Sequence, residues 1–355
     1  MDERNNIMGM LDLMVSPGFC VQNHTIIKRN PAAESLLLPQ GTDILPLLHT
    51  GQQEYAEFES GCLYLTLCLG GQLFGASVTR LGDMDVFVLE EKDDQTEFRS
   101  MALAARELRE PLTNVMVTAN RLFPLSAQDA DPTLQEQTAR LNRGLYQMLR
   151  ILGNMSDAGM DRTSCQEVCD LRAIMAEIFE KAAATVSHTG ITLTYTGPKE
   201  PLLGLANREQ LERAVLNILS NAIKFTPNGG SIQAALTRRG NLLQLSVVDS
   251  GDGIPENILS SLFRRYLRQP GIEDSRFGIG LGMVLIRNAA TAHGGTVLID
   301  QPKGSGTRVT LTIKLRQAAS TGLHSPILRV DYSGERDHCL LELSESLPAH
   351  LYKPE

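Results

Sequence analysis

The chain has 355 residues, of which 42% are hydrophobic and 21% charged, and its formal net charge is −8 at pH 7. This composition is typical of a chain that buries a core, and the length is sufficient for two or three domains. The acidic balance argues against a general nucleic-acid binder, so we expect no nucleic-acid partner.

No stretch of the sequence approaches the ~20 apolar residues that a membrane-spanning helix needs, so we expect no membrane span. The first residues, MDERNNIMGMLDLMV, are acidic and lack the long apolar core of a signal peptide. Six cysteines show no disulfide-like spacing, and Cys165 and Cys169 lack the second pair or nearby histidine of a zinc site. We therefore expect a cytoplasmic protein with ordinary thiols.

Residues 8–92 predict a small domain that contains both strands and helices. Two β-rich runs precede a helix that is expected to begin after Asn30, a favourable N-cap followed by proline. Three further strand-like runs follow, CLYLTLCLG, QLFGASVTRL and DVFVLEE, separated by glycine-containing turns. This order resembles a PAS sensor domain. The sequence indicates no ligand for it, and His24 and His49 are interpreted as surface or structural residues rather than haem ligands.

Residues 95–160 predict two long helices, each with one apolar seam at heptad spacing. The linker FPLSAQDADP is rich in helix breakers, and Asp131 before Pro132 is expected to cap the second helix. Two such helices have a thin core, so we expect a four-helix bundle formed by dimerisation. A helical hairpin packed on its own chain is the alternative. The seam residues are Met101, Ala105, Leu108, Leu112, Val115, Ala119 and Leu122, then Leu134, Leu141, Leu145, Met148, Leu152 and Met155.

Residues 165–316 alternate between helical and strand patterns and predict an α/β-sandwich domain. The expected elements include strands in GITLTYTG, LLQLSVVDSG, GTVLID and GTRVTLTIKL, and helices over 207–223 and 282–293. In the extension at residues 317–355, SPILRVDYSG and HCLLELSESLP are similar to the two strands of a β-hairpin. No chemical motif is identified in this extension.

The first motif of the α/β domain is NILSNAIKFTPNGG, which places Asn217 and Asn221 one helical turn apart on one face. Amide oxygens are hard ligands that suit Mg²⁺, and Lys224 adds a positive charge nearly one turn further on. This spacing alone is also common on ordinary helix surfaces.

Two glycine-containing motifs follow in the same domain. DSGDGIP follows a strand and offers the Asp249 carboxylate to an adenine amine, with Gly251 and Gly253 allowing close backbone approach. FGIGLG, at residues 277–282, opens a helix whose free N–H groups suit a phosphate chain. Each motif is weak alone. Their order and spacing together are a strong signal for a nucleotide site.

Together these motifs resemble the sensor histidine kinase family, within the GHKL group of ATPases that includes DNA gyrase. NILSNAIKFTPNGG is similar to the N box, DSGDGIP to the G1 box, FRRYLR (residues 263–268) to the F box and SRFGIGLG to the G2 box. The resemblance covers residues 95–316 and, loosely, the PAS-like region. It implies an α+β multidomain fold: a PAS-like α/β sensor, a two-helix hairpin that forms a dimeric four-helix bundle, and an α/β-sandwich ATP-binding domain.

The resemblance also implies roles for the matching residues, with ATP and Mg²⁺ as cofactors. Asn221 would hold Mg²⁺, and Asn217 would help to arrange the reacting groups. Asp249 would recognise adenine, and Thr307 would line the adenine pocket. The phosphates would be surrounded by Lys224, Gly278, Gly280 and Gly282, with Arg265 and Arg268 of the lid stabilising charge on the γ-phosphate.

In this family the first bundle helix carries an H box of the form His-Glu/Asp-Leu-Arg-x-Pro-Leu. Residues 106–112 read RELREPL, so Arg106 stands where the phosphate-accepting histidine is expected. A neutral imidazole has a lone pair, whereas a guanidinium stays protonated and has none. Glu107, which would assist the histidine, is retained, and no histidine occurs within 95–160. We therefore expect no self-phosphorylation by the family mechanism.

Two functional interpretations stay open. In the first, the chain is a histidine-kinase-type phosphotransferase that transfers phosphate to a histidine of another protein, as a homodimer or heterodimer through residues 95–160. In the second, it is an ATP-binding pseudokinase scaffold that regulates another histidine kinase or a response regulator. Slow ATP hydrolysis as the main activity is a less favoured third interpretation.

Overall fold

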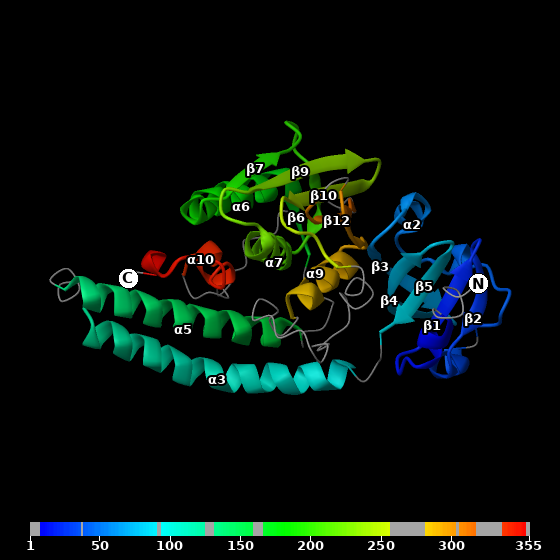
Figure 1. The fold of residues 1–355 in the computed structure, drawn as a ribbon, viewed down its shortest axis with the longest axis horizontal. Coiled ribbons are helices and arrows are strands. Elements are labelled where there is room, and N and C mark those ends of the chain that lie inside the picture. The colour runs from blue at the N-terminus through cyan, green and yellow to red at the C-terminus, as the bar shows by residue number, and fades with distance from the viewer. Residues whose placement is uncertain are drawn as a thin grey trace.

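The computed structural model describes residues 8–36, 38–90, 94–124, 131–158, 166–255, 281–302, 305–316 and 336–352. Together they form an α+β structure with three main parts (Figure 1). An N-terminal unit (residues 8–90) lies at one end, a long helical hairpin (94–158) runs along one side, and an α/β unit (166–316) packs above the hairpin. A C-terminal segment (336–352) lies between the hairpin and the α/β unit.

The N-terminal unit has the predicted order of two strands, helices and three strands. Asn23 and His24 form the turn between the first two strands, with φ values of 49° and 62°. The buried Asn30 accepts hydrogen bonds from the backbone N–H groups of Gly18 and Ala33, and the helix that it begins is a 3-10 helix. The elements are β1 (Gly18–Gln22), β2 (Thr25–Arg29), η1 (Pro31–Leu36), η2 (Leu45–Leu47), α2 (Gln52–Glu57), β3 (Cys62–Leu69), β4 (Gln72–Leu81) and β5 (Met84–Leu89).

The hairpin consists of α3 (Asp94–Leu122) and α5 (Pro132–Ala158), which pack against each other. Asp131 caps α5 as predicted, because its Oδ1 accepts a hydrogen bond from Thr133 N at 2.8 Å. Helix α3 continues through Pro111.

Each predicted seam is only partly buried within the hairpin. The buried members are Ala105, Leu112, Ala119, Leu145 and Leu152. Five other members are large apolar side chains between 39% and 67% exposed, and we call them the exposed stripe: Leu108, Val115, Leu122, Leu141 and Met148. A surface of this kind is typical of a helix pair that has a further partner.

The α/β unit packs three helices against a sheet. Its helices are α6 (Leu171–Val186), α7 (Arg208–Phe225) and α9 (Leu281–Ala292), with the short η3 (Ser187–Thr189) after α6. Its strands are β6 (Glu167–Asp170), β7 (Thr192–Thr196), β8 (Leu203–Ala206), β9 (Ser231–Arg239), β10 (Leu242–Asp249), β11 (Val297–Asp300) and β12 (Arg308–Lys314). The buried sides of these helices share one hydrophobic core with the sheet and the hairpin.

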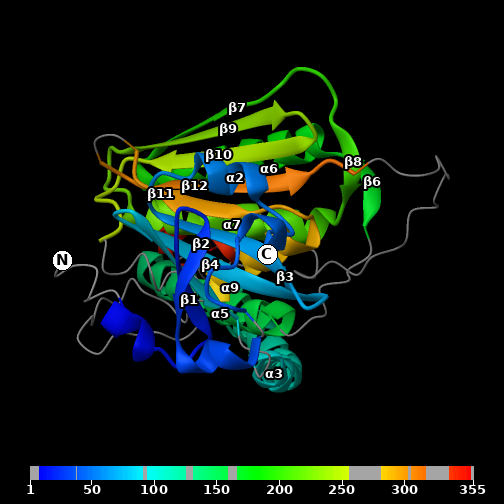
Figure 2. The ribbon, with the colours of Figure 1, turned by 90° about the vertical axis from the view of Figure 1, so that its right-hand side faces the viewer.

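Ten strands of the N-terminal unit and the α/β unit join into one sheet, in the order β2-β1-β5-β4-β3-β11-β12-β10-β9-β7 (Figure 2), and β6 and β8 pair in a separate two-stranded sheet. The junction is the antiparallel pair β3–β11, in which Val297 lies opposite Tyr64 and Ile299 opposite Cys62. Gly61, just before β3, has φ of +96°, and a Cβ there would lie 2.2 Å from the backbone oxygen of Ile299. The close approach of the two strands therefore requires glycine at this position.

The C-terminal segment corrects the sequence-based expectation of a β-hairpin. The first expected strand, SPILRVDYSG, lies outside the described residues. The second, HCLLELSESLP, forms helix α10 (His338–Glu342) instead, and η4 (Ala349–Leu351) follows. The Asp337 side chain accepts a hydrogen bond from Leu340 N and so caps the helix. Leu341, Leu343 and Leu347 are buried in the core shared with the hairpin and the α/β unit, which favours a helix packed between them.

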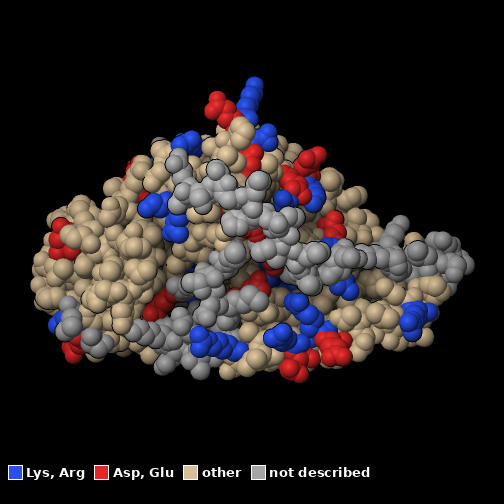
Figure 3. All heavy atoms as spheres, turned by 180° about the vertical axis from the view of Figure 1, so that it is seen from behind, with Lys and Arg blue, Asp and Glu red and all other residues tan. Residues whose placement is uncertain are grey.

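On the face shown in Figure 3, basic and acidic side chains are interspersed along the hairpin rather than gathered into one patch. None of the described helices combines the length and the apolar character that crossing a bilayer requires.

Candidate functional site

Helix α7 carries Asn217, Asn221 and Lys224 of the first motif. It begins after Asn207, whose side chain accepts a hydrogen bond from Gln210 N at 2.9 Å and so caps the helix. Asn217, Asn221 and Lys224 are four and three residues apart, so they share one face of α7. Asn217 is buried, and the other two are partly exposed.

Asn217 is held from both sides. Its Oδ1 accepts a hydrogen bond from Arg150 Nη2 at 3.3 Å, and its Nδ2 donates to the backbone oxygen of Arg213 at 2.8 Å. Gly282, at the start of α9, lies so close that a Cβ there would be 2.9 Å from Asn217 Oδ1. The structure thus brings the last glycine of FGIGLG next to the first asparagine of the α7 motif.

Asn221 and Lys224 have different neighbours. The Asn221 amide nitrogen lies 3.9 Å from Met283 Sδ, as a weak donor, which leaves the amide oxygen for a cation. Lys224 Nζ lies 3.1 Å from Glu345 Oε2 of the C-terminal segment. The site therefore has an oxygen ligand suited to Mg²⁺ beside a cation suited to phosphate.

Asp249 ends strand β10 and is buried. Its Oδ1 accepts hydrogen bonds from Gly251 N at 2.9 Å and Thr307 N at 3.2 Å, so the structure brings Asp249 and Thr307 together. Burial raises the pKa of the Asp249 carboxyl, and these backbone donors oppose the shift. With Oδ1 engaged, the second carboxylate oxygen is the acceptor suited to an exocyclic amine.

The glycines of DSGDGIP approach protein backbone and side chains closely. A Cβ on Gly251 would lie 2.4 Å from the backbone oxygen of Phe225, so this glycine lets the loop pack on the end of α7. Gly253 has φ of +81°, the left-handed region that favours glycine. The predicted site residues Arg265, Arg268, Gly278 and Gly280 lie outside the described residues.

The H-box region lies on α3. Ala105 is buried, whereas Arg106 and Glu107 are exposed, as the predicted seam requires. The guanidinium at the expected acceptor position is therefore accessible. Burial, together with the positive charges of Arg213 and Arg336, lowers the pKa of Arg109 in the same motif.

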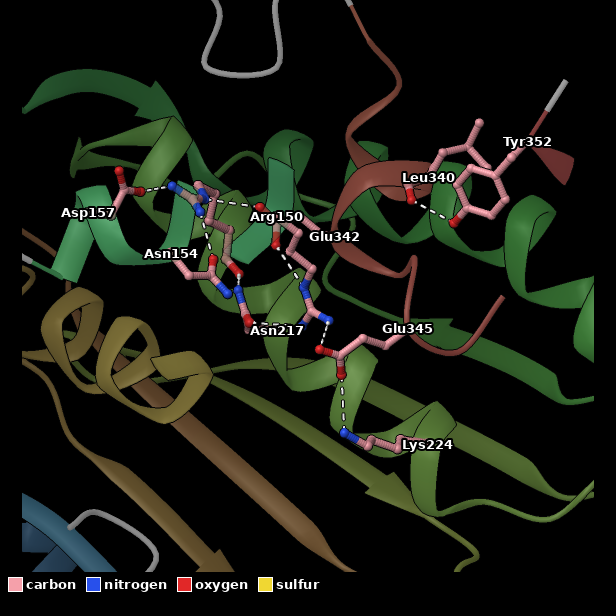
Figure 4. A network of polar contacts seen from close by, with 10 residues as sticks. Arg150, Asn154, Asp157, Asn217, Lys224, Leu340, Glu342, Glu345 and Tyr352 are labelled. Atoms are coloured by element: carbon pink, nitrogen blue, oxygen red, sulfur yellow. Dashed lines mark hydrogen bonds and ion pairs between the residues drawn. The ribbon is translucent and has the colours of Figure 1, made fainter. Parts of the chain in front are cut away.

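A buried polar network that was not predicted from the sequence lies beside Asn217 (Figure 4). Arg213 Nε lies 3.0 Å from Glu342 Oε1, and Arg150 Nε lies 3.5 Å from Glu342 Oε2. Arg213 also pairs with Asp157, and its Nη2 donates a hydrogen bond to Asn154 Oδ1 at 2.8 Å. The network joins α5, α7 and the C-terminal segment.

The network is sensitive to the loss of any member, because all its central charges are buried. The Glu342 side chain is fully buried, and those of Arg150 and Arg213 are 7% and 3% exposed. Removing one partner of a buried ion pair costs about 3–5 kcal/mol, since the other charge is left uncompensated. The signal in the sequence was slight: Arg213 lies one turn before Asn217, and two glutamates occur in the C-terminal ELSE.

Comparison with known proteins identifies the ATPase domain. Residues 206–317 match the model of the "Histidine kinase-, DNA gyrase B-, and HSP90-like ATPase" domain. The chain is 31% identical to the adaptive-response sensory kinase SasA of Synechocystis over 63% of its own length, and 31% identical to the histidine protein kinase DivJ of Caulobacter vibrioides over 61%. Residues 206–317 therefore form an ATPase domain of this family, and the chain is similar to sensor histidine kinases beyond that domain.

Its α/β unit accordingly contains a histidine-kinase-type ATPase domain. The matched part spans 62% of SasA and 37% of DivJ, less than two thirds of either relative. Among solved structures, full-length ShkA in complex with AMPPNP aligns with a TM-score of 0.49 and 20% identity, covering 62% of this chain and 46% of ShkA.

Proposed function

We propose that this chain is a member of the sensor histidine kinase family, a cytoplasmic signal-transduction protein that binds Mg²⁺–ATP at α7, the end of β10 and the start of α9. The observation that carries the proposal is the convergence of separate motifs on one site. Gly282 adjoins Asn217, and the Asp249 carboxylate accepts a hydrogen bond from Thr307 N. Asn221 and Lys224 supply an amide oxygen and an ammonium group on the same face of α7.

Each group suits one part of the nucleotide. The buried Asp249 carboxylate would accept a hydrogen bond from the adenine amine, and Thr307 would lie beside it. Asn221 would hold Mg²⁺, which neutralises phosphate charge when bound, and Asn217 would position the reacting groups. Lys224, with Gly278, Gly280 and Gly282, would surround the phosphates, and Arg265 and Arg268 would act on the γ-phosphate.

The phosphate acceptor lies on another protein in this proposal. Arg106 is exposed at the acceptor position and has no lone pair, so Glu107 has no imidazole to assist within its own hairpin. A histidine of a partner kinase, or of another signalling protein, would receive the phosphate instead. The exposed stripe supports a homodimer or heterodimer through residues 95–160, because pairing would bury its five apolar side chains. The N-terminal unit would act as the PAS-like sensor.

A second candidate function is an ATP-binding pseudokinase scaffold that regulates another histidine kinase or a response regulator without transferring phosphate. Two observations favour it: Arg106 in the acceptor position, and the pairing of Lys224 with Glu345 rather than with solvent.

Calorimetry with Mg²⁺–ATP tests the binding site. We expect Asn221→Ala to weaken binding by loss of a metal ligand, and Asp249→Ala to remove the preference for adenine over guanine nucleotides. Asn241→Ala, in an exposed turn, is the matched control and should bind as the unmutated chain does. Failure of the unmutated chain to bind ATP would contradict the proposal.

Incubation with ATP labelled on the γ-phosphate, alone and with candidate partner proteins, separates the two candidate functions. Label on a partner histidine supports the transferase. ATP binding without label on any partner supports the scaffold.

A further inference from the structure

The C-terminal segment places a carboxylate at the phosphate side of the proposed nucleotide site (Figure 4). Glu345 Oε2 lies 3.1 Å from Lys224 Nζ, and Glu345 Oε1 lies 3.3 Å from Arg150 Nη1. A carboxylate and a phosphate engage an ammonium group in the same way, through charge-assisted hydrogen bonds. Glu345 therefore competes with a nucleotide phosphate for the Lys224 ammonium group.

The backbone around Glu345 is held in this position by helix α5. Arg143 donates from Nε to the backbone oxygen of Ser344 at 3.1 Å and from Nη2 to that of Glu345 at 2.8 Å. Gln147 Nε2 also donates to the Ser344 oxygen, at 3.1 Å. On either side of these contacts Leu343 and Leu347 are buried in the main core. The position of Glu345 thus depends on several contacts besides its pairing with Lys224.

The Glu345 carboxylate is negative at neutral pH. Burial by itself raises the pKa of this carboxyl, but the charges of Arg150 and Lys224 bring it below its ordinary value. A triphosphate that approached Lys224 would meet this negative charge and would be repelled by it.

The contacts of Glu345 are nevertheless suited to release. Its ion pairs, at 3.1 and 3.3 Å, are longer than the ~2.7–2.9 Å of the strongest charge-assisted pairs. Its side chain is 34% exposed, whereas that of Glu342 is fully buried. Glu345 can therefore leave Lys224 while Glu342 keeps α10 attached.

We infer that the C-terminal segment is an intramolecular inhibitor of nucleotide binding, in which Glu345 occupies the phosphate position at Lys224 and ATP must displace it. This inference rests on the proposed function, because it assigns the phosphates of ATP to Lys224. Nucleotide binding and docking of the turn at Ser344–Ser346 then exclude each other, and anything that draws this turn away from α5 activates the site.

The affinity of the full chain for Mg²⁺–ATP, measured by calorimetry, tests the inference. If the docked turn is present in about nine-tenths of the molecules, Glu345→Gln binds ATP about tenfold more tightly than the unmutated chain. Glu136→Gln removes the same charge from an exposed position on α5 and leaves the affinity unchanged.

A second variant separates release of the turn from a local charge effect. Arg143→Ala removes two contacts that hold the turn and alters no residue of the nucleotide site, so it also tightens ATP binding. If Glu345→Gln binds ATP more tightly and Arg143→Ala does not, the idea that ATP displaces the turn is overturned. In the unmutated chain, saturating Mg²⁺–ATP should accelerate amide exchange at Ser346 and Leu347, whose N–H groups bond to the Leu343 oxygen.

The possible failures are distinguishable. Equal affinities in the unmutated chain, Glu345→Gln and Arg143→Ala would overturn the inhibitor and leave the proposed ATP site intact. Absence of binding in all three would overturn the proposed function and the inference with it.

Discussion

Glu90 Oε1 and Arg287 Nη1 lie 2.7 Å apart and join the N-terminal unit to helix α9. Glu90 follows the last strand of the N-terminal unit, and the hydroxyl of Tyr64 donates to the same carboxylate oxygen at 2.8 Å. Arg287 is 3% exposed, with its guanidinium 5.8 Å from the centre of the Tyr64 ring. A buried charge pair therefore lies beside the β3–β11 junction, where the strands of the two units meet in one sheet.

Loss of this pair should destabilise the folded chain. We expect Glu90→Gln to lower the free energy of unfolding by about 3 kcal/mol, because the buried Arg287 charge loses its partner. Urea unfolding measures the effect. The matched control is Glu57→Gln at the exposed Glu57–Arg239 pair, where the change should be below about 1 kcal/mol. Equal shifts in the two variants would show that the Glu90 pair is not buried in solution.

The β3–β11 pairing can be tested through Gly61. In Gly61→Ala the new Cβ meets the backbone oxygen of Ile299, in addition to the strain of a positive φ. Gly71→Ala is the control: its φ of +80° gives the same backbone strain, but nothing lies within 4 Å of its Cβ. We expect Gly61→Ala to be more destabilising by at least about 1 kcal/mol and to accelerate amide exchange in β11. Equal effects would argue against the continuous sheet.

Arg106→His should restore a complete H box. The variant has an exposed imidazole beside Glu107, and positioning supplies most of phosphoryl-transfer catalysis. With labelled ATP we expect an acid-labile, base-stable label in the variant and none in the unmutated chain. Adding Asn221→Ala should remove the label. A variant that binds ATP but stays unlabelled would favour the pseudokinase scaffold, and label in the unmutated chain would contradict the interpretation of Arg106.

Dimerisation should depend on the exposed stripe rather than on the buried part of the seam. Val115→Asp changes a side chain that is 52% exposed, so it should abolish the dimer in sedimentation while the helical content is kept. Leu145→Asp instead buries a charge within the hairpin, since Leu145 is 1% exposed, and should unfold it. A monomer at micromolar concentration for the unmutated chain would rule out the dimer.

A pH dependence of stability should arise from His293. Its Nε2 accepts a hydrogen bond from Asn207 N at 3.0 Å, and its Nδ1 lies 2.7 Å from the Ala289 oxygen, so the ring is neutral with the proton on Nδ1. Burial lowers the pKa of His293 below 6.5, so the unfolded chain binds the proton more tightly than the folded chain. The contribution of His293 to the free energy of unfolding is complete above pH 6.5 and is lost as the pH falls through the lowered pKa.

Unfolding experiments between pH 7.5 and 5.5 measure this contribution. The free energy of unfolding should fall across the range in the unmutated chain and in the control His49→Gln, which alters an exposed histidine. In His293→Gln the free energy of unfolding should be lower at pH 7.5 and should depend less on pH. An unchanged slope in His293→Gln would contradict the assignment.

Features that depend on neighbouring residues along the chain were predictable from the sequence. The periodicity of the apolar residues predicted the strands of the N-terminal unit, both hairpin helices, α7 and α9, because it records which side of an element is buried. The sequence also placed Asn217 and Asn221 on a helix and Asp249 at the end of a strand, because the apolar residues around them show the periodicity of those elements.

Only the tertiary structure decided how these elements meet. The leucines of HCLLELSESLP fit a strand or a helix, and the hydrophobic core supplied by the hairpin and the α/β unit favoured the helix that Asp337 caps. Likewise, the division of the heptad seam into buried and exposed halves depends on how α3 packs on α5. The contact between Arg143 and Ser344 joins residues 201 positions apart, and no local pattern encodes such a pair. The same holds for Lys224 and Glu345, which are 121 positions apart and pair only when the chain folds and brings the C-terminal segment beside α7.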